Sequence, residues 1–301
     1  TNLGAFFGRH IPSFNISDQY ALAFELPAHG REPRVSEEKL LVEGNSIYSR
    51  QEAQVTLASR DREVQFLVDW HLVALPVIQE QSEQDPLHSF KIWLARLIIL
   101  APIPSLVKGE SNAETLEIQK ECLNFGDWFS GLLSRYPAAY TQIDKYLRDV
   151  MPDVQDFLNE PTGKDAKNMV VRFEASDSTL SIDFEDLSDG EKCFFLCASV
   201  LAANKYYGPL FCFWDEPDNY LSLPEVGHFV TALRRSFRSG GQILATSHNE
   251  EAIRRFSNEN TIFLERKSHL EPTIARLLSD LPPTAISGDL VDSLIRDEIH
   301  L

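Results

Sequence analysis

An uninterrupted apolar run over residues 210–214 ends in two adjacent carboxylates, Asp215 and Glu216, which Pro217 follows. Such a run is typical of a strand that is buried on both faces of a mostly parallel sheet. Ligands of open α/β sheets bind outside the carboxyl ends of the strands, which is where the two acids lie. We therefore expect an α/β fold with a ligand site at the end of this strand.

The two acids are expected to have different roles, because adjacent residues of a strand point to opposite faces. Asp215 is the candidate ligand of Mg²⁺, since this ion prefers oxygen ligands and keeps several of its waters. Glu216 is the candidate group that polarises an attacking water molecule. A solvated pair of acids at a strand end, with no ligand, is the competing interpretation.

A second feature is the run Ser188, Asp189, Gly190 and Glu191, which opens a predicted apolar helix. Serine is a good N-cap, and the two acids suit the positive end of the helix dipole. Glycine lets backbone N–H groups approach a phosphate closely. Because the acids disfavour a tightly bound lone phosphate, we expect a surface that meets a nucleotide held mainly by other residues.

A third feature is His248, which comes directly after another predicted short strand over residues 241–246. In a parallel sheet its imidazole would lie at the same edge as Asp215, where it could contact a terminal phosphate. The competing interpretation is a Ser-His turn that only caps the next helix.

Taken together, these stretches resemble the motifs of ABC-type ATPases. LSDGEK at residues 187–192 is similar to their signature motif, FCFWDEP at 211–217 to their Walker B strand with its catalytic glutamate, and TSHN at 246–249 to their switch-histidine loop. Residues 219–222 fall where that family has its D-loop. Within the class, the motifs are most similar to those of the RecF- and OLD-like AAA ATPases of DNA repair and anti-phage defence. The resemblance covers about residues 166–266.

The resemblance implies the fold of a P-loop NTPase-like ABC ATPase head, with a mixed sheet, an antiparallel β layer and a helical insertion. It implies that ATP and Mg²⁺ are bound, with Asp215 at the metal and Glu216 and His248 in catalysis. It also implies nucleotide contacts made across a dimer, from Ser188, Asp189, Gly190, Glu191, Asn219 and Ser222. The expected partners are a second copy, in a homodimer or higher oligomer that sandwiches the nucleotides, and a separate effector protein.

One element of the family is missing from the sequence, namely a P-loop of the form G-x-x-x-x-G-K-[ST]. The run from Gly4 to Arg9 is one residue short and lacks the lysine and the hydroxyl. The run around Gly163 and Lys164 lacks the first glycine and the hydroxyl. Two explanations remain open: the chain begins after this segment, which we favour, or it is a half-site subunit that uses the P-loop of a partner.

Four parts are expected along the chain. They are a β-rich part of the head over residues 1–80, a helical insertion over 81–165, a C-terminal ATPase lobe over 166–285 and a tail helix over 286–301. Residues 1–15 are expected to form a loop or a helix end that leads into a strand. The expected strands cover residues 20–26, 39–43, 47–48, 55–57, 64–67, 169–173, 180–184 and 261–265. Helices are expected within 86–160, from apolar stripes over residues 90–98, 116–133 and 140–150, and also over 226–237 and 249–256.

Composition limits the partners. The formal net charge is −17 and no cluster of five or six basic residues occurs, so direct binding of nucleic acid is disfavoured, although a local groove stays open. No apolar run is long enough to span a bilayer. Cysteines 122, 193, 197 and 212 have no C-x-x-C spacing and are expected to be buried apolar side chains of a cytoplasmic protein. Nothing in the sequence selects Gln19 or Gln54 as a Q-loop glutamine.

Two hypotheses of function follow. The first is an ATP hydrolase that switches a partner in anti-phage defence or DNA repair. The second is a non-catalytic half-site or scaffold module that lends its signature face to another ATPase. The intact N-terminal sequence decides between them, since a P-loop upstream supports the first hypothesis.

Overall fold

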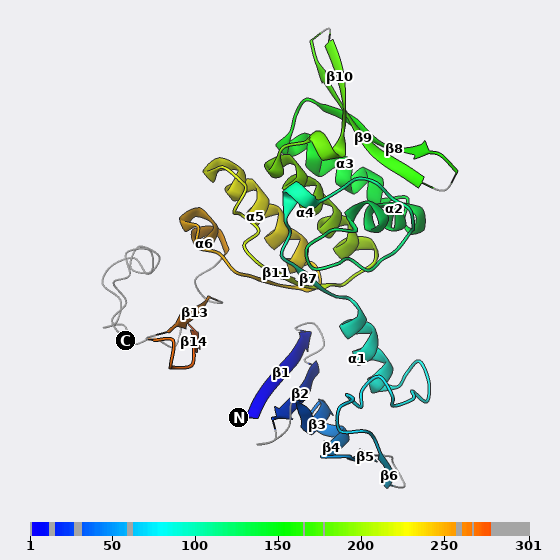
Figure 1. Ribbon diagram of the computed structural model, residues 1–301, viewed down its shortest axis with the longest axis vertical. Coiled ribbons are helices and arrows are strands. Elements are labelled where there is room, and N and C mark those ends of the chain that lie inside the picture. The colour runs from blue at the N-terminus through cyan, green and yellow to red at the C-terminus, as the bar shows by residue number, and fades with distance from the viewer. Residues whose placement is uncertain are drawn as a thin grey trace. The chain divides into compact units, whose positions relative to one another are not determined.

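The computed structural model describes residues 2–11, 16–26, 32–58, 63–164, 166–176, 178–256, 261–266 and 268–277. The chain forms two compact units, Thr1–Ala95 and Arg96–Leu301 (Figure 1). In the described part, no helix combines the length and the apolar character needed to cross a membrane.

The first unit is an antiparallel sheet of six strands that neighbour one another in chain order. The strands are β1 (Asn2–Ile11), β2 (Ile16–Glu25), β3 (Arg34–Val42), β4 (Asn45–Gln51), β5 (Gln54–Ala58) and β6 (Glu63–Leu67). The strands predicted within residues 20–67 are confirmed. The expectation of a loop or helix end is wrong for residues 2–11, because the backbone of β1 pairs with β2 along its whole length; residues 12–15 lie outside the described residues.

Buried and more exposed side chains alternate along the strands, and the buried ones form the core of this unit, as expected for a sheet with one buried face. Leu40 and Tyr48 are fully buried. The two-residue turn that joins β3 to β4 has positive φ at both Glu43 and Gly44, which matches the twist of an antiparallel hairpin. Helix α1 (Pro86–Ala95) covers the sheet through Phe90, whose ring centroid lies 5.6 Å from that of Tyr20.

A buried polar cluster lies in the same unit, around the carboxylate of Glu38. This group accepts hydrogen bonds from the hydroxyls of Tyr20 and Tyr48, at 2.9 and 2.6 Å. It also accepts bonds from the backbone amides of residues 74–75 and lies 3.6 Å from the guanidinium of Arg50. A buried charge needs such partners, so Glu38 joins the loop after β6 to the sheet.

The second unit contains a parallel sheet of three short strands, β7 (Leu97–Leu100), β11 (Phe211–Trp214) and β12 (Gln242–Ala245), with β11 in the centre. The apolar runs at 210–214 and 241–246 are confirmed as strands. The helical interpretation of Leu97 and Ile98 is wrong, because both residues pair with β11. A short apolar run has no periodicity that separates a buried strand from a buried helix.

Ile99 and Leu244, in register on one face of this sheet, are 43 % and 42 % exposed. The helices of the unit lie on the other side, as Figure 1 shows. They are α2 (Phe125–Arg135), α3 (Ala139–Val150), α4 (Asp189–Tyr206), α5 (Leu223–Arg238) and α6 (Glu250–Phe256), with the short 3-10 turns η1 (Pro104–Leu106) and η2 (Phe184–Asp186). Helix α4 is buried without interruption from Lys192 to Asn204, and Figure 1 shows it between α5 and α2. A helix that is apolar on all sides belongs in a core, which explains its lack of a polar face.

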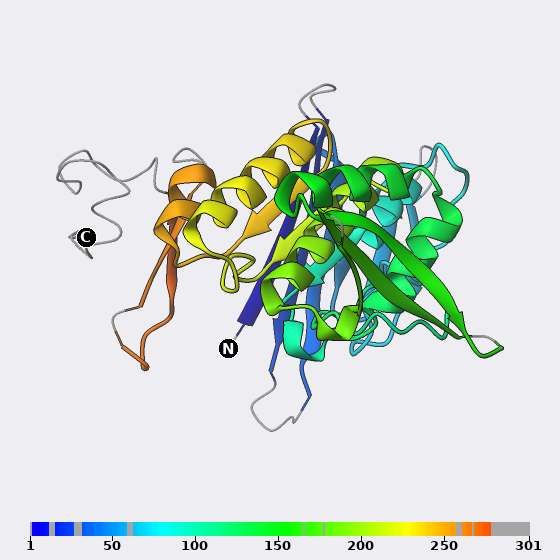
Figure 2. The same cartoon turned by 90° about the horizontal axis from the view of Figure 1, so that it is seen from above.

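An antiparallel sheet of β8 (Val154–Thr162), β9 (Ala166–Ala175) and β10 (Ser178–Asp183) completes the second unit, together with the hairpin of β13 (Ile262–Glu265) and β14 (Ile274–Leu277). Figure 2 shows the β8–β9 hairpin extending away from the helices. The expected boundary at residues 165/166 falls inside this hairpin, and β8 occupies part of the segment that was expected to be helical. The four-part division of the chain stays a prediction, and its tail helix over 286–301 lies outside the described residues.

The predicted helical stripe over residues 116–133 is correct only from Phe125 onward. Before it, the side chain of Asn124 closes a turn by accepting from the backbone amide of Gln119 at 2.8 Å and donating to the carbonyl of Glu117 at 2.9 Å. Cys122 adopts a positive φ of 61°. Asparagine side chains compete with helical hydrogen bonds in this way, so the helix starts after the turn.

Candidate ATP site

Two neighbouring parallel strands bring the two predicted acids and His248 to one edge of the sheet. Trp214 pairs with Ala245, so the residues that follow, Asp215 and Thr246, leave the sheet side by side. The backbone amide of Thr246 donates to the carbonyl of Trp214 at 3.1 Å. The carboxyl ends of both strands therefore present their side chains at the same place.

The hydroxyl of Thr246 bridges the two acids. It donates to Oδ1 of Asp215 at 2.6 Å and accepts from the backbone amide of Glu216 at 2.9 Å. One hydroxyl can do both because it has one donor and two lone pairs. The bond to Asp215 engages one carboxylate oxygen, and the side chain of Asp215 is exposed at the strand end.

The chain turns away from the direction of β11 at Glu216, which has a left-handed backbone conformation with φ of 47°. Strand alternation therefore does not set the directions of the two acids, which corrects the expectation from the sequence. Non-glycine residues with positive φ are uncommon and often occur at functional sites. This turn carries Oε1 of Glu216 to 3.4 Å from Nε2 of His248, while Oε2 accepts a hydrogen bond from the amide of Asn219.

A buried acid lies directly behind this pair. Asp218 is only 2 % exposed, and its Oδ2 accepts a hydrogen bond of 3.0 Å from the hydroxyl of Ser247. Burial, followed by the charge of Glu216, raises the pKa of Asp218 above its usual value, against the lowering effect of the Ser247 bond. Asp218 thus joins the loop after β11 to the loop that carries His248.

The start of α4 lies against residues 220–221 of the same chain. A Cβ placed on Gly190 would be 3.1 Å from the carbonyl oxygen of Tyr220 and 3.8 Å from the side chain of Leu221. Glycine therefore permits a close approach that any larger residue would strain. The candidate residues Gly190 and Asn219 accordingly come from neighbouring loops in the second unit.

Ser188 and Ser222 both begin helices. Ser188 donates through its amide and its hydroxyl to Glu191, each at 2.7 Å, and its hydroxyl accepts from the amide of Glu191 at 3.3 Å. Ser222 donates in the same manner to Glu225, at 2.7 and 2.6 Å. These capping boxes account for both serines in structural terms. Ser188 and Ser222 are also exposed, and Asp189 is half-buried.

The side chains at this edge suit one divalent ion that keeps most of its waters. Within the described ranges, no group of three or more His, Cys, Asp or Glu side chains is arranged to hold a metal. Mg²⁺ needs no such group, since it binds through one or two carboxylates and the phosphates of a substrate. Asp215 fits this requirement, because its carboxylate is exposed and Thr246 engages only one of its oxygens.

Sequence reasoning missed the roles of Thr246, Asp218 and Asn249. Oδ1 of Asn249 accepts from the amides of Glu251 and Ala252, at 2.9 and 3.4 Å, and so caps α6. A hydroxyl and an acid beside the recognised motifs were visible in the sequence. What was missing was the pairing of β11 with β12, which brings residues about 30 positions apart into contact. His248, in contrast, was expected at this edge and lies there.

The cysteines are outside this site. All four are buried and unpaired by disulfides, as expected from their spacing. Burial, with a smaller effect of the charge of Asp189, raises the pKa of Cys193 to about 12. Cys193 and Cys197 on α4 are therefore packing residues.

Comparison with protein families identifies one match. The family described as "AAA domain, putative AbiEii toxin, Type IV TA system" matches residues 77–254, which is more than half of the chain. The matched range contains all the candidate residues of the ATP site. Comparison with curated proteins finds no match.

Several solved structures are similar to the chain. A crystal structure of the SmcHead bound to the C-winged helix domain of ScpA covers 92 % of this chain and 74 % of its own, with 12 % identity and a TM-score of 0.51. A Smc head with an extended coiled coil, bound to ScpA and derived from Pyrococcus furiosus, covers 49 % and 36 %, with 18 % identity and a TM-score of 0.38. A structure from work on ATP-driven dimerization and DNA-stimulated activation of SMC ATPases covers 49 % and 88 %, with 15 % identity and a TM-score of 0.40. At these identities the first match shows the fold alone.

Proposed function

The chain belongs to this AAA domain family and has the fold of an ABC-type ATPase head, and from that premise we propose that it binds ATP with Mg²⁺ and hydrolyses it. The observation that carries the proposal is the meeting of Glu216 and His248, from the ends of two adjacent strands, at 3.4 Å. Phosphoryl transfer to water depends mainly on positioning and on stabilisation of charge, and these strand ends provide fixed positions.

Asp215 is the proposed ligand of Mg²⁺, directly or through a water. Bound Mg²⁺ supplies charge neutralisation at the β- and γ-phosphate oxygens. Thr246 orients the carboxylate by donating to its Oδ1 at 2.6 Å, and the other oxygen would be available to hold the ion. A metal-binding side chain whose rotamer is already fixed by a hydrogen bond to a neighbouring residue loses less conformational freedom when it binds the ion.

Glu216 is the proposed general base. Its side chain is 37 % exposed, so water reaches it, and Asn219 and the turn at positive φ limit its directions. The carboxylate accepts the proton of the attacking water, and His248 lies beside it to contact the terminal phosphate.

A second copy is proposed to close the site. The side chain of His248 is 91 % exposed, which leaves the proposed reaction open to bulk solvent in a single chain. Electrostatic stabilisation of phosphoryl transfer is strongest where water is excluded. Ser188, Asn219 and the 43 % exposed Tyr220 lie on loops that a second copy could cover, in a nucleotide sandwich that opens after hydrolysis.

The test is the steady-state ATPase activity of the full natural polypeptide and of Glu216→Gln. Loss of the base is expected to lower kcat by a factor of about 100 or more, with ATP binding retained. The matched control is Glu250→Gln, an equal loss of charge at an exposed residue of α6 whose carboxylate pairs with Arg254 of the same helix. Unchanged turnover in Glu216→Gln, or an equal loss in Glu250→Gln, contradicts the assignment of the base.

A second candidate function rests on the lack of a G-x-x-x-x-G-K-[ST] run in these 301 residues. In this alternative the chain is a half-site module that offers Ser188 and Gly190 to the nucleotide of another ATPase. The two functions differ in one measurement. A half-site module does not bind ATP alone and accelerates hydrolysis by a P-loop subunit, whereas the hydrolase binds and turns over ATP without one.

The pathway is proposed from the resemblance of the motifs to RecF- and OLD-like ATPases, which act in DNA repair and anti-phage defence. In either setting the nucleotide cycle would switch a separate effector protein. Phage challenge and DNA-damage survival, measured for cells carrying the wild type and Glu216→Gln, distinguish the two settings.

A further inference from the structure

A groove with a volume of 1480 Å³ opens between α3, the last turns of α4, and α5. None of its lining residues belongs to the candidate ATP site. The groove exceeds the roughly 300–1,000 Å³ of typical small-molecule pockets, so its size suits a segment of a macromolecule.

The lining is basic although the chain is strongly acidic. Among the charged residues there, six are lysine or arginine and one, Asp149, is an acid. The whole chain has 28 basic and 45 acidic residues. The basic lining residues are Lys145, Lys205, Arg234, Arg235, Arg238 and Arg255.

Two of the arginines have structural roles. Arg255 pairs with Glu251 at 2.7 Å, and its guanidinium lies 3.4 Å from a Cβ placed on Gly227, so it packs on α5. Arg234 donates to the backbone carbonyl of Arg255 and so joins α5 to α6. These contacts explain Arg234 and Arg255 without a ligand.

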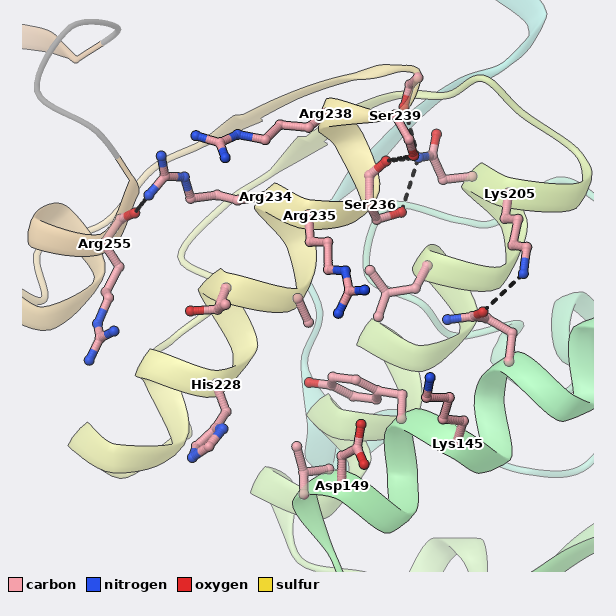
Figure 3. A pocket seen from close by; sticks show the side chains of 18 of the residues that line it. Lys145, Asp149, Lys205, His228, Arg234, Arg235, Ser236, Arg238, Ser239 and Arg255 are labelled. Carbon is pink, nitrogen blue, oxygen red and sulfur yellow. Dashed lines mark hydrogen bonds between the residues drawn. The ribbon is translucent and has the colours of Figure 1, made fainter.

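Among the described residues, the other four cations have no carboxylate partner, and one of them, Arg238, points away from the wall that carries the two lysines in Figure 3. In the part of the chain that the structure describes, no acid lies within 4.0 Å of the charged groups of Lys145, Lys205 or Arg235. All three residues are exposed and come from α3, α4 and α5 respectively. Figure 3 shows Arg235 pointing from α5 into the groove, toward the wall that carries the two lysines.

The walls are fixed to each other at one end by Asn204, which is only 7 % exposed. Its amide donates to the carbonyls of Ser236 and Gly240, at 3.3 and 2.9 Å, and its Oδ1 accepts from the amide of Leu210 at 3.0 Å. The spacing of α4 and α5 is thereby set before any ligand binds. A preformed groove saves the entropy that ordering two separate walls would cost.

Cations that face one another across a groove repel each other, and an anion between them removes that repulsion. Arginine adds a fork that binds carboxylates with two hydrogen bonds. A long nucleic acid would also lie over the acidic surface outside the groove and be repelled there. A short acidic segment of a protein avoids this cost. We propose that the groove binds an acidic segment of a partner protein through Lys145, Lys205 and Arg235.

The test uses the full chain and a fluorescein-labelled peptide of alternating Asp-Gly and Glu-Gly repeats, with binding followed by fluorescence anisotropy. Reversal of the three cations, in Lys145→Glu with Lys205→Glu and Arg235→Glu, is expected to weaken binding at least about tenfold. Binding by the wild type is expected to weaken as salt is raised.

A matched control reverses two lysines and one arginine that are exposed in the same unit but outside the groove, in Lys108→Glu with Arg135→Glu and Lys164→Glu. This triple variant changes the net charge equally and is expected to bind as the wild type does. If both triple variants lose affinity equally, the binding is a general effect of charge and the proposal is overturned. It is also overturned if the wild type does not bind the peptide.

Two further binding experiments test whether the groove binds DNA or the chain's own tail. A labelled DNA duplex that binds through the same three cations while the peptide does not would assign the groove to nucleic acid. The acids Asp289, Asp292, Asp297 and Glu298 follow the described part of the chain. If the peptide binds only after these acids are changed to amides, the chain's own tail is the occupant. Either result overturns the proposal of a partner protein.

The control for correct folding is a neutral variant, Lys145→Gln with Lys205→Gln and Arg235→Gln. Thermal unfolding of each protein is measured beside it. The neutral variant removes the attraction without adding repulsion, so it is expected to lose affinity while its unfolding midpoint stays close to that of the wild type. Retention of full affinity in this folded variant contradicts the proposed contacts.

Discussion

At the scale of single residues, one hydroxyl decides how the two strand-end acids are placed. Thr246 donates to Asp215 and accepts from the amide of Glu216, so it fixes a side chain and a backbone turn together. Glu216 has a positive φ of 47°, a conformation that needs such support from its surroundings. Thr246 is thus a positioning residue that acts through both acids.

Thr246→Val is nearly isosteric and removes both hydrogen bonds. We expect kcat to fall about tenfold or more and the free energy of unfolding to fall by about 1–3 kcal/mol, because a backbone amide and a carboxylate lose a partner. Thr246→Ser keeps the hydroxyl and is expected to retain most of the activity. ATPase assays and urea unfolding of both variants test this, and equal activities for valine and serine would contradict it.

Asp218 gives a dependence of stability on pH. Burial raises its pKa in the folded protein, so the folded state binds its proton more tightly than the unfolded state does. The stabilisation from this proton is fully present below pH 3.8, the usual pKa of the group, and is lost as the pH rises through the raised pKa. Above the raised pKa the folded protein therefore carries a buried charge.

Asp218→Asn removes that charge and keeps an oxygen for the hydroxyl of Ser247. We expect the variant to be more stable than the wild type at pH 7, and the difference to shrink as the pH falls toward 5. Urea unfolding at both pH values measures the difference. A variant that is less stable than the wild type by the same amount at both values would show that burial of the charge is not the dominant effect.

At the scale of elements, periodicity predicted most strands and helices but not their neighbours. The stripe of Tyr140, Ile143 and Leu147 corresponds to α3, and the apolar run before Asp215 corresponds to β11. The strand β7 was missed because four apolar residues have no distinct period. Which strands lie beside β11 depends on packing, so the site could be expected at a sheet edge, whereas the bridge by Thr246 could not.

The stability of the first unit depends on polar contacts between a loop and the sheet, which the apolar pattern of the sequence does not indicate. Glu38 joins the loop at residues 74–75 to the sheet and lies 3.6 Å from the buried Arg50. Removal of the Glu38 side chain would leave the buried guanidinium of Arg50 without this nearby carboxylate. We expect Glu38→Ala to lower the free energy of unfolding by about 3–5 kcal/mol.

The control for this change is Glu37→Ala, on the same strand and exposed to solvent. Surface substitutions of this kind usually change stability by less than about 0.5 kcal/mol. Denaturant unfolding of the two variants compares them directly. Similar losses in both would show that the strand position, and not the buried cluster, determines the effect.

At the scale of the whole molecule, one basic groove contrasts with the acidic charge of the rest of the chain. The chain carries a net charge of −17, yet three cations converge in one groove of the second unit. Arg235 lies on a helix that the sequence predicts, over residues 226–237, but Lys145 and Lys205 join it only through the packing of three helices. The absence of a basic cluster in the sequence therefore did not exclude a basic groove in the fold.

In the proposed site, a second copy would enclose the nucleotide over the exposed His248 and the exposed loops at Ser188 and Asn219. The sharpest test of this arrangement is the molar mass of Glu216→Gln in solution, measured by light scattering with ATP and with ADP. The proposed site predicts a dimer with ATP, because hydrolysis is stopped after the sandwich closes, and a monomer with ADP. The same mass with both nucleotides would contradict a site that two copies share.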